Sequence, residues 1–469
     1  MKLRKLFPAL TIALLVSSPV SGSDPFSEKS VPPVPEIELS GRLDKQNLDK
    51  LVAYGETLFS ARFTSQDGVG RPMATQAIIP TKRRQPLENT FFRTAGLDAG
   101  SCAACHNMPR PGGAGDFVTN VFVSEGFESA DFDNLDPQFS NERGTNHLFG
   151  AGLIELLARE MTADLQQQRK QALKSARNSG EPVEAALETK GVGFGKITAH
   201  PDGMLDLSKI DGVDSDLVVR PFSQKGVMTS LRQFTVNALN HHHGIQPLER
   251  WGVRWTGEQD FDEDGQADEF DLAQVSAITA WQATLAPPEQ LNPGDKSWQA
   301  AAERGSTRFD EIGCNTCHIR ALPLTSLRFE DPGPYDVAGT LRKADVSEPA
   351  VYDLELRDWI RQLERNEKGQ IMVPLFGDLK RHVIADHQVA HFGNELLAQR
   401  FVGRNVFQTT ELWGVASTGP YGHRNDLTTL DEAIRAHGGA ARKSRDRYVK
   451  MAEQDRRDLI AFLKTLVIK

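Results

Sequence analysis

Apolar residues recur with helical spacing in four stretches of the chain, near 48–59, 231–239, 272–285 and 459–467. Residues at intervals of three and four lie on one face of a helix, so each stretch predicts a helix with a buried side. The apolar positions are Leu48, Leu51, Val52, Leu58 and Phe59; Leu231, Phe234, Ala238 and Leu239; Leu272, Val275, Ile278, Trp281 and Leu285; and Leu459, Leu463, Leu466 and Val467.

Three further segments have recognisable local patterns. The mostly polar residues 162–178 predict an exposed helix. Residues 195–210 predict a hairpin that turns at Pro201–Asp202–Gly203. Before the last apolar stripe, Thr429 and Glu432 have the spacing of a capping box, and Gly438 suits the C-terminal cap of the same helix.

The first residues of the chain are typical of a secretory signal. Residues 1–22 combine a basic start, a short apolar run and small residues suited to cleavage. The apolar run is too short for a membrane span, and no later run approaches about 18 apolar residues, so we expect no membrane span in the mature chain. Residues 23–45 are proline-rich and polar, which predicts an extended arm.

Length and charge limit the classes of function. A chain of 469 residues allows two or three domains. Its formal net charge is −9, which argues against nucleic acid as a partner and is compatible with a protein redox partner.

All four cysteines lie in two copies of the pattern C-x-x-C-H: Cys102 and Cys105 before His106, and Cys314 and Cys317 before His318. A redox dithiol would use one such pair and leave the histidines without a role. A structural zinc ribbon usually separates its pairs by only about 15–20 residues, whereas these pairs are more than 200 residues apart. Covalent haem uses every element of the pattern, because the thiols attach the porphyrin and the histidine binds the iron. The sequence therefore predicts two haem c groups.

A second repeat supports a duplicated haem domain. Gly55 and Phe59 precede the first motif, and Gly305 and Phe309 precede the second, each pair at positions i and i+4 of a predicted helix. The glycine would allow a second helix to approach closely, and the aromatic ring would pack near the haem edge. Two ordinary amphipathic helices would give the same spacing at either site alone.

Residues 260–271, DFDEDGQADEFD, resemble a calcium-binding EF-hand loop. Oxygen donors at alternate positions around a glycine turn are what a hard cation needs. The ligand positions of that loop correspond to Asp260, Asp262, Asp264, the Gln266 carbonyl, Asp268 and Asp271. Asp at the last position and the absence of a long helix before the loop weaken the match, and an acidic solvated turn is the alternative.

The two C-x-x-C-H motifs and the C-terminal segments 412–439 and 456–468 resemble the di-haem oxidoreductases, a family of putative peroxidases related to bacterial di-haem cytochrome c peroxidases and latex-cleaving di-haem oxygenases. The resemblance extends over most of residues 46–469. It implies two cytochrome-c-like haem domains, a calcium ion between them, and one haem that accepts electrons while the other reacts.

The distal ligand of the second haem departs from that pattern. The peroxidases carry a methionine in this segment, where this sequence has Gly422. His423 is the immediate candidate to replace it, although it could instead hydrogen-bond a propionate or a carbonyl. The weaker candidates are Tyr421, His382, His387 and His391.

The first haem lacks the distal histidine that the peroxidases place soon after the motif. The next histidine is His147, so either His147 binds the iron or this face is open to peroxide or dioxygen. The histidine run 241–243 ends at Gly244, which is typical of a helix C-terminus, and a role near a haem or second metal is the alternative. Candidate acid/base residues are Glu125, Glu128 and Glu142, and nothing in the sequence selects one.

These observations predict a mainly α protein with two cytochrome-c-like haem domains. We expect a signal peptide at 1–22, an arm at 23–45, an N-terminal haem domain at 46–160, a connecting region with a small hairpin and a calcium-type loop at 161–293, and a C-terminal haem domain at 294–469.

The expected function is that of a periplasmic peroxidase that takes electrons from a small cytochrome or cupredoxin. An oxygenase acting on an organic substrate and a non-enzymatic electron-transfer cytochrome are the alternatives.

Overall fold

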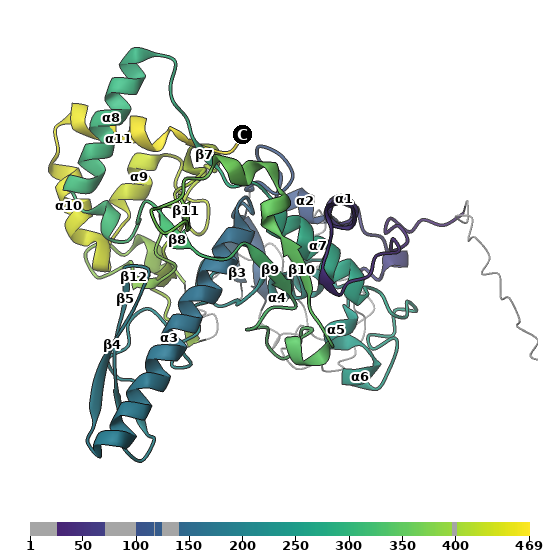
Figure 1. Cartoon of the computed structure of the whole chain (residues 1–469). Coiled ribbons are helices and arrows are strands. Elements are labelled where there is room, and N and C mark those ends of the chain that lie inside the picture. Colours follow the sequence, from purple (N-terminus) through teal and green to yellow (C-terminus); the bar gives the residue numbers. More distant parts are fainter. Residues whose placement is uncertain (1–25, 71–99, 117, 124–139, 396–400) are drawn as a thin grey trace, which may run out of the picture.

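The computed structural model describes residues 26–70, 100–116, 118–123, 140–395 and 401–469. Helices are its longest elements, which confirms the prediction of a mainly helical chain (Figure 1). The α-helices are α1 (Lys45–Ser60), α2 (Cys102–Cys105), α3 (Ala151–Ser179), α4 (Leu231–Ala238), α5 (Leu248–Trp251), α6 (Val253–Thr256), α7 (Leu272–Thr284), α8 (Lys296–Glu311), α9 (Leu430–Arg435), α10 (Arg442–Lys450) and α11 (Glu453–Leu463). The expected signal peptide lies outside the described residues.

Within the described residues, short strands pair into six small sheets, in the orders β1-β10-β9, β4-β5-β6, β2-β3, β7-β14, β8-β11 and β12-β13. The strands are β1 (Gly41–Arg42), β2 (Val118–Val123), β3 (Ser140–Gly144), β4 (Val183–Thr189), β5 (Val192–Ala199), β6 (Leu205–Asp206), β7 (Glu289–Gln290), β8 (Leu322–Leu324), β9 (Arg328–Asp331), β10 (Ala350–Asp353), β11 (Ile371–Val373), β12 (Arg381–Val383), β13 (Val406–Gln408) and β14 (Leu466–Val467).

The N-terminal arm is fixed to the rest of the chain. Tyr54 of α1 donates a hydrogen bond to the carbonyl of Pro32 at 2.8 Å. The Asp67 carboxylate accepts from the backbone nitrogen of Ser30 at 3.1 Å. Strand β1 then pairs in parallel with β10, with Gly41 opposite Ala350. Residues far along the chain therefore complete the packing around α1.

Helices α1 and α7 cross at Gly55. A Cβ atom at Gly55 would lie 2.0 Å from the carbonyl oxygen of Ala277, so only glycine fits there. Phe59, one turn later, packs against Trp281 of α7 with ring centroids 4.3 Å apart. The predicted close approach of a second helix to Gly55 is present. That second helix is α7, which lies within residues 161–293, the range expected to form the connecting region.

Helices α8 and α11 repeat this arrangement at Gly305. A Cβ there would lie 1.9 Å from the carbonyl oxygen of Asp458. Phe309 packs on Phe462 of α11, with centroids 5.6 Å apart. The apolar stripe of the last helix faces α8 with Leu459 and Leu463 buried, whereas Leu466 and Val467, which were predicted on the same helix, form the strand β14.

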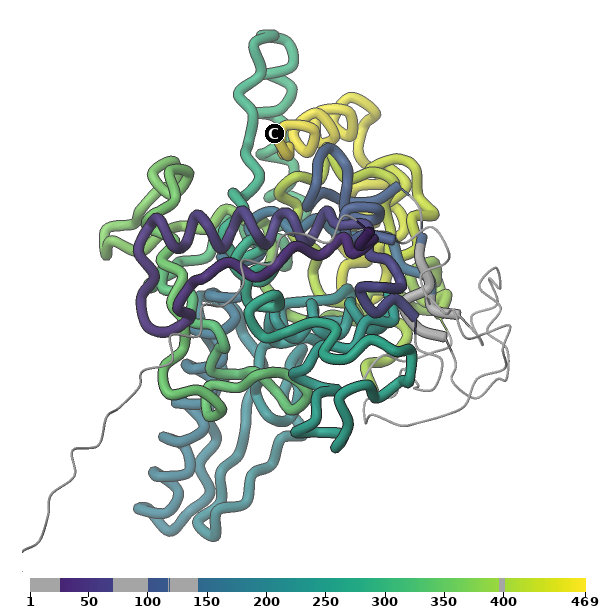
Figure 2. Tube along the Cα trace, turned by 90° about the vertical axis from the view of Figure 1, so that its right-hand side faces the viewer, coloured from purple at the N-terminus to yellow at the C-terminus, as the bar shows by residue number. Residues whose placement is uncertain are grey.

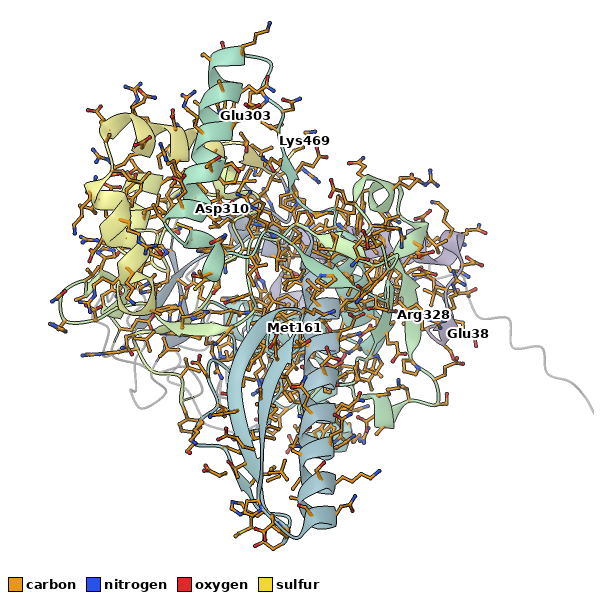
Figure 3. The ribbon with its side chains drawn as sticks, turned by 60° about the vertical axis from the view of Figure 1, so that its left-hand side comes forward. Glu38, Met161, Glu303, Asp310, Arg328 and Lys469 are labelled. Carbon is orange, nitrogen blue, oxygen red and sulfur yellow. The ribbon has the colours of Figure 1, made fainter. Side chains whose placement is uncertain are left out.

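Helix α3 extends away from the main body together with the β4–β5 hairpin (Figures 1 and 2). Its first half is buried, and Met161 lies at 0 % exposure near the middle of the molecule (Figure 3). Its second half is the exposed helix predicted over 162–178. The hairpin predicted over 195–210 is formed by β5 and β6, with the turn at Pro201–Gly203.

We predict that Gly305→Ala destabilises the protein although alanine favours helix. The new methyl group would collide with the Asp458 carbonyl, and overpacking of this kind costs about 1–3 kcal/mol. Gly294→Ala is the matched control, because its Cβ meets nothing within 4 Å, and we expect a change within about 0.5 kcal/mol. Urea unfolding midpoints measure both, and equal midpoints for the two variants would contradict the crossing.

Candidate functional site

The first C-x-x-C-H motif forms the single turn α2. Ser101 caps the turn by accepting a hydrogen bond from the backbone nitrogen of Ala103. His106 follows the turn, with its Nδ1 atom 3.3 Å from the carbonyl oxygen of Gly113. Burial lowers the pKa of His106 to about 4, so the ring is neutral at physiological pH, which is the form that binds a metal.

Ring side chains from two helical segments lie beside this motif. Phe59 of α1 lies 5.9 Å from the His106 ring. His243 ends a π-helical turn (Leu239–His243), and its Nε2 atom is 3.8 Å from the Cys102 sulfur. Gly244 ends that turn with φ 75°, which confirms its predicted capping role. A π-helical turn often marks a functional site, and here it brings a histidine to the motif.

The second motif has the same local design. Cys314 lies in a short 3₁₀ turn (Cys314–Thr316) that follows α8. His318 Nδ1 is 3.2 Å from the carbonyl oxygen of Phe376. Burial lowers the pKa of His318 to about 4. Both motif histidines therefore have Nδ1 held by a backbone carbonyl, the arrangement that orients most metal-binding histidines.

The cysteines fit haem attachment better than redox chemistry. All four are free thiols. Burial raises the pKa of Cys102 and of Cys314 to about 12. A reactive dithiol needs a lowered thiol pKa, so these thiols are not poised for disulfide exchange.

A cavity of about 320 Å³ opens beside the second motif, within the size range of cofactor sites. Cys314, Cys317 and His318 line it, together with residues from the C-terminal segment and from the region after the first motif. The remaining walls include Asn146, His147, Phe309, His382, Phe392, Phe407, Trp413, Tyr421, His423, Leu459 and His437. A mostly apolar hollow with both cysteines and a carbonyl-held histidine fits a covalent haem. Cys102, Cys105 and His106 are not among its lining residues.

His423, the distal ligand expected from sequence, lines this cavity. Its ring lies between Phe407 and Phe392, with centroids 4.6 and 5.9 Å away. Nε2 is 3.3 Å from Glu395 Oε1 but is not aligned for a hydrogen bond, and Nδ1 also has no hydrogen-bond partner among the described residues. Burial and the nearby cations lower its pKa to about 2.

The other histidines named from the sequence are already engaged or exposed. His382 Nε2 is 2.7 Å from Asp378 Oδ2. Burial alone would lower the pKa of His382, but the hydrogen bonds and charges of Asp378 and Cys317 together outweigh it and raise the pKa to about 10. His391 lies 3.2 Å from Asp426, His387 is exposed, and His147 Nε2 is 3.2 Å from the Trp413 carbonyl.

His437, which the sequence analysis did not single out, also lines the cavity. It follows α9, whose capping box of Thr429 and Glu432 is formed as predicted. Gly438 is not the left-handed cap expected from sequence, because its φ is −116° and its nitrogen bonds to Ile384 O at 2.7 Å. The sequence feature that could have indicated a role for His437 is its position at a helix end, directly before two glycines.

Buried charges gather beside His423. The Glu395 carboxylate lies 2.6 Å from Arg143 and 3.1 Å from Lys225. Glu142 pairs with Arg424 at 2.5 Å. Of the three candidate acid/base residues, Glu142 is therefore close to the His423 segment, whereas Glu125 and Glu128 lie outside the described residues.

Three carboxylates of the calcium-type loop converge. Ligand atoms of Asp260, Asp262 and Asp264 all lie within 4.8 Å of one another. Asp262 is 0 % exposed, and both of its carboxylate oxygens lack a hydrogen-bond partner among the described residues. Burial, followed by the neighbouring carboxylates Asp264 and Asp260, raises its pKa to about 8.

The last two positions of the loop do not join this cluster. Asp268 is exposed, and Asp271 accepts a hydrogen bond from the backbone nitrogen of Gln274 to cap α7. Glu269, which the loop pattern skips, is half-buried near Asp262, and burial followed by the charge of Asp262 raises the pKa of Glu269. Because Asp271 caps α7, it is not available as the last ligand that the EF-hand pattern assigns to it.

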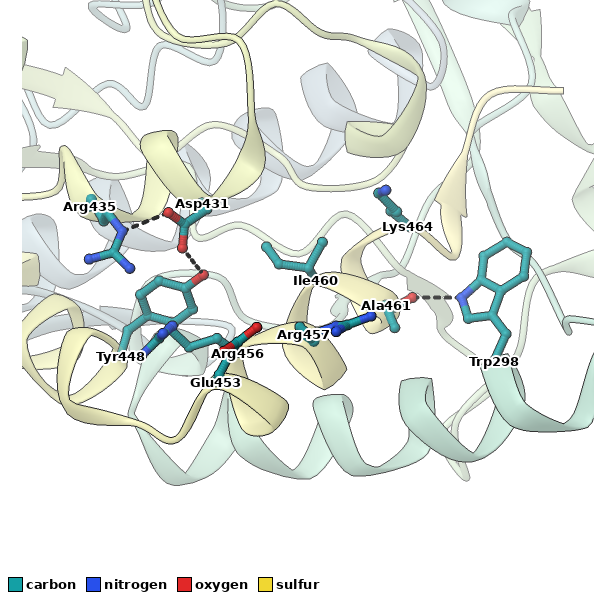
Figure 4. A pocket seen from close by; sticks show the side chains of 10 residues that line it. All are labelled: Trp298, Asp431, Arg435, Tyr448, Glu453, Arg456, Arg457, Ile460, Ala461 and Lys464. Carbon is teal, nitrogen blue, oxygen red and sulfur yellow. Dashed lines mark hydrogen bonds and ion pairs between the residues drawn. The ribbon is translucent and has the colours of Figure 1, made fainter.

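A separate surface hollow of about 720 Å³ lies on the C-terminal helices (Figure 4). Asp431 binds Arg435 and Tyr448 there, and Trp298 Nε1 donates to the Ala461 carbonyl. No residue of either C-x-x-C-H motif lines this hollow. None of the helices that the structure describes has a stretch apolar enough, and long enough, to traverse a bilayer.

No model of a known protein family matches the chain. Over 204 residues it is 31 % identical to cytochrome-c peroxidase IdrP1 of Denitromonas iodatirespirans, a match that covers 41 % of this chain and 48 % of that protein. The chain thus spans about half the length of the curated relative that it matches.

Two solved structures are similar at lower identity. Hydrazine synthase of Kuenenia stuttgartiensis is 13 % identical with a TM-score of 0.38, over 98 % of this chain and 100 % of that chain. A MauG-like protein associated with microbial copper homeostasis is 15 % identical with a TM-score of 0.27, over 56 % and 77 % of the two chains. Over the matched 204 residues the chain is thus a distant relative of a cytochrome-c peroxidase, and it carries two complete C-x-x-C-H motifs.

Proposed function

We propose that this chain is a periplasmic di-haem c-type oxidoreductase that reduces hydrogen peroxide with electrons from a small cytochrome or cupredoxin. The observation that carries the proposal is the paired local design of the motifs. Each has two unpaired cysteines followed by a half-buried, neutral histidine whose Nδ1 is held by a carbonyl. The distant peroxidase relationship supports the same chemistry.

In this proposal Cys102 and Cys105 attach one haem, and Cys314 and Cys317 attach the other. His106 and His318 bind the two irons through Nε2, because Nδ1 is engaged with a carbonyl. When bound, each haem supplies a redox-active iron, and an open face supplies a site for a small oxidant. We assign α1, α2 and α7 to the first haem region and α8 and α11 to the second, and the signal peptide at 1–22 directs export.

An open face at the first haem is what separates an enzyme from a carrier. The sequence has no histidine between His106 and His147, and His147 directs Nε2 to the Trp413 carbonyl. Both facts favour an open first haem. The oxygenase alternative uses the same open face for dioxygen, and the electron-transfer alternative requires that both faces are closed.

The second element of the proposal is a calcium ion in the loop 260–271. A fully buried carboxylate with no partner is costly unless a cation neutralises it, and Asp262 is in that position. We propose that Asp260, Asp262 and Asp264 bind calcium together with Glu269, in place of Asp268 and Asp271, and that the Gln266 carbonyl completes the loop. The site lies directly before α7, the helix that packs on α1.

We predict two covalent haems per mature chain by intact mass spectrometry and no thiol that reacts with iodoacetamide. Cys314→Ala with Cys317→Ala should leave one haem, and Cys102→Ala with Cys105→Ala should leave the other. Stoichiometric peroxide should oxidise the reduced protein, with turnover when a donor is present. Dioxygen uptake with an organic substrate and no peroxide consumption would instead establish the oxygenase, and inertness to peroxide, dioxygen and cyanide would leave the carrier.

We predict that Asp262→Asn has opposite effects with and without calcium. In chelator at a pH above about 8, where the Asp262 carboxyl is ionised, it should raise the melting temperature because it removes an unpaired buried charge, and it should abolish the gain that calcium gives the parent protein. That gain is about 2.7 kcal/mol at a calcium concentration 100 times the dissociation constant. Asp268→Asn is the matched control and should retain the calcium response.

The same carboxyl group predicts a pH dependence. The folded-state pKa of Asp262 is about 8, above the unfolded value of about 4. The folded state therefore holds the proton more tightly, and the calcium-free protein should lose stability as the pH rises from about 4 to about 8. Thermal melts in chelator across this range test the sign. A slope that is identical in Asp262→Asn would contradict the assignment.

A further inference from the structure

His437 has the geometry of a metal ligand. Its Nδ1 atom is 2.7 Å from the carbonyl oxygen of Ala433, one helical turn earlier. A nitrogen that donates to a carbonyl carries the ring proton, so Nε2 keeps its lone pair. Nε2 has no hydrogen-bond partner among the described residues, and the ring lines the cavity beside Cys314, Cys317 and His318.

The two motif histidines share this design. Nδ1 of His106 faces the Gly113 carbonyl, and Nδ1 of His318 faces the Phe376 carbonyl. His437 and His318 also line the same cavity, and they are close enough that a charge on His437 contributes to the lowered pKa of His318. The cavity thus contains two imidazoles whose Nδ1 atoms each face a backbone carbonyl, and only one of them belongs to a C-x-x-C-H motif.

The backbone around His437 is fixed by contacts that require its two following glycines. A Cβ at Gly438 would lie 2.5 Å from the Val389 carbonyl oxygen, and a Cβ at Gly439, where φ is +50°, would lie 2.2 Å from that of Val383. The Gly439 nitrogen donates to the Asp386 carboxylate at 2.6 Å. The segment that carries His437 is therefore pressed against the 383–389 backbone, which holds the ring in place.

The other imidazoles of the cavity do not combine an Nδ1 held by a carbonyl with an available Nε2. His382 has its Nε2 on the Asp378 carboxylate, and His147 has its Nε2 on the Trp413 carbonyl. His423 is held by aromatic rings, and no carbonyl orients either of its nitrogens. His437 alone among these four combines an anchored Nδ1 with an available Nε2 in the described part of the cavity.

We propose that His437 would be the sixth ligand of the iron of the second haem, with the Ala433 carbonyl as its orienting partner. The inference rests on the proposed attachment of haem at Cys314 and Cys317. It makes the second haem a closed, bis-histidine centre of lower potential than a histidine–methionine haem, and it explains how the chain dispenses with a methionine at Gly422. The second haem then transfers electrons and leaves reaction with the oxidant to the first.

The test is the spin state of the oxidised di-haem protein. His437→Ala should convert one low-spin haem to high spin in the absorption and electron paramagnetic resonance spectra. Added imidazole should restore the low-spin signal, and the variant should bind one more cyanide per chain than the parent. His387→Ala is the matched control, because this exposed histidine lies on the neighbouring segment, and its spectra should be unchanged.

A second variant keeps the test informative if His437→Ala does not mature. His437→Met should stay six-coordinate and raise the midpoint potential of the second haem, as methionine ligation does. Loss of the low-spin signal in His423→Ala, with retention in His437→Ala, would overturn the inference in favour of His423. Intact mass separates this failure from failure of the proposed function, because two covalent haems would still be present.

Discussion

Two helix crossings, in each of which a glycine of one helix touches the backbone of the other, determine where both motif segments lie. Gly55 of α1 contacts α7, and Gly305 of α8 contacts α11. The close approach lets Phe59 pack against Trp281 beside His106, and lets Phe309 pack on Phe462 at the wall of the cavity. Since the contact is between backbones, a single methyl group at either glycine alters the position of an entire helix.

Local patterns predicted much of this arrangement. The apolar stripes predicted the helices α1, α7 and α11. The capping box predicted the start of α9, and the turn residues predicted the β5–β6 hairpin. The glycine–phenylalanine repeat gave the close crossings, because i and i+4 positions share a helix face. These predictions succeed because the information lies within one or two helical turns.

The features that were missed depend on distant residues. Nothing near Gly41 indicates that it pairs with Ala350, and nothing in residues 272–285 names α1 as the partner of α7. The calcium-type loop was assigned by position, but Asp271 serves as a helix cap, so Glu269 lies near the cluster instead. His437 could not be predicted for a related reason. The features that suggest it as a ligand are its hydrogen bond to Ala433 and its place in the cavity beside His318, and a histidine at a helix end belongs to no recognisable sequence motif.

The α1–α7 crossing has a consequence for the order in which the chain is made. A polypeptide that grows from its N-terminus presents Cys102 and Cys105 long before residues 272–284 exist, whereas Cys314 and Cys317 follow α8 at once and wait only for the last helix. The first motif is therefore made before its neighbouring helix pair can close, because α1 has no partner until α7 follows. The second motif already has α8 in place when it is made, and only α11 is still to come.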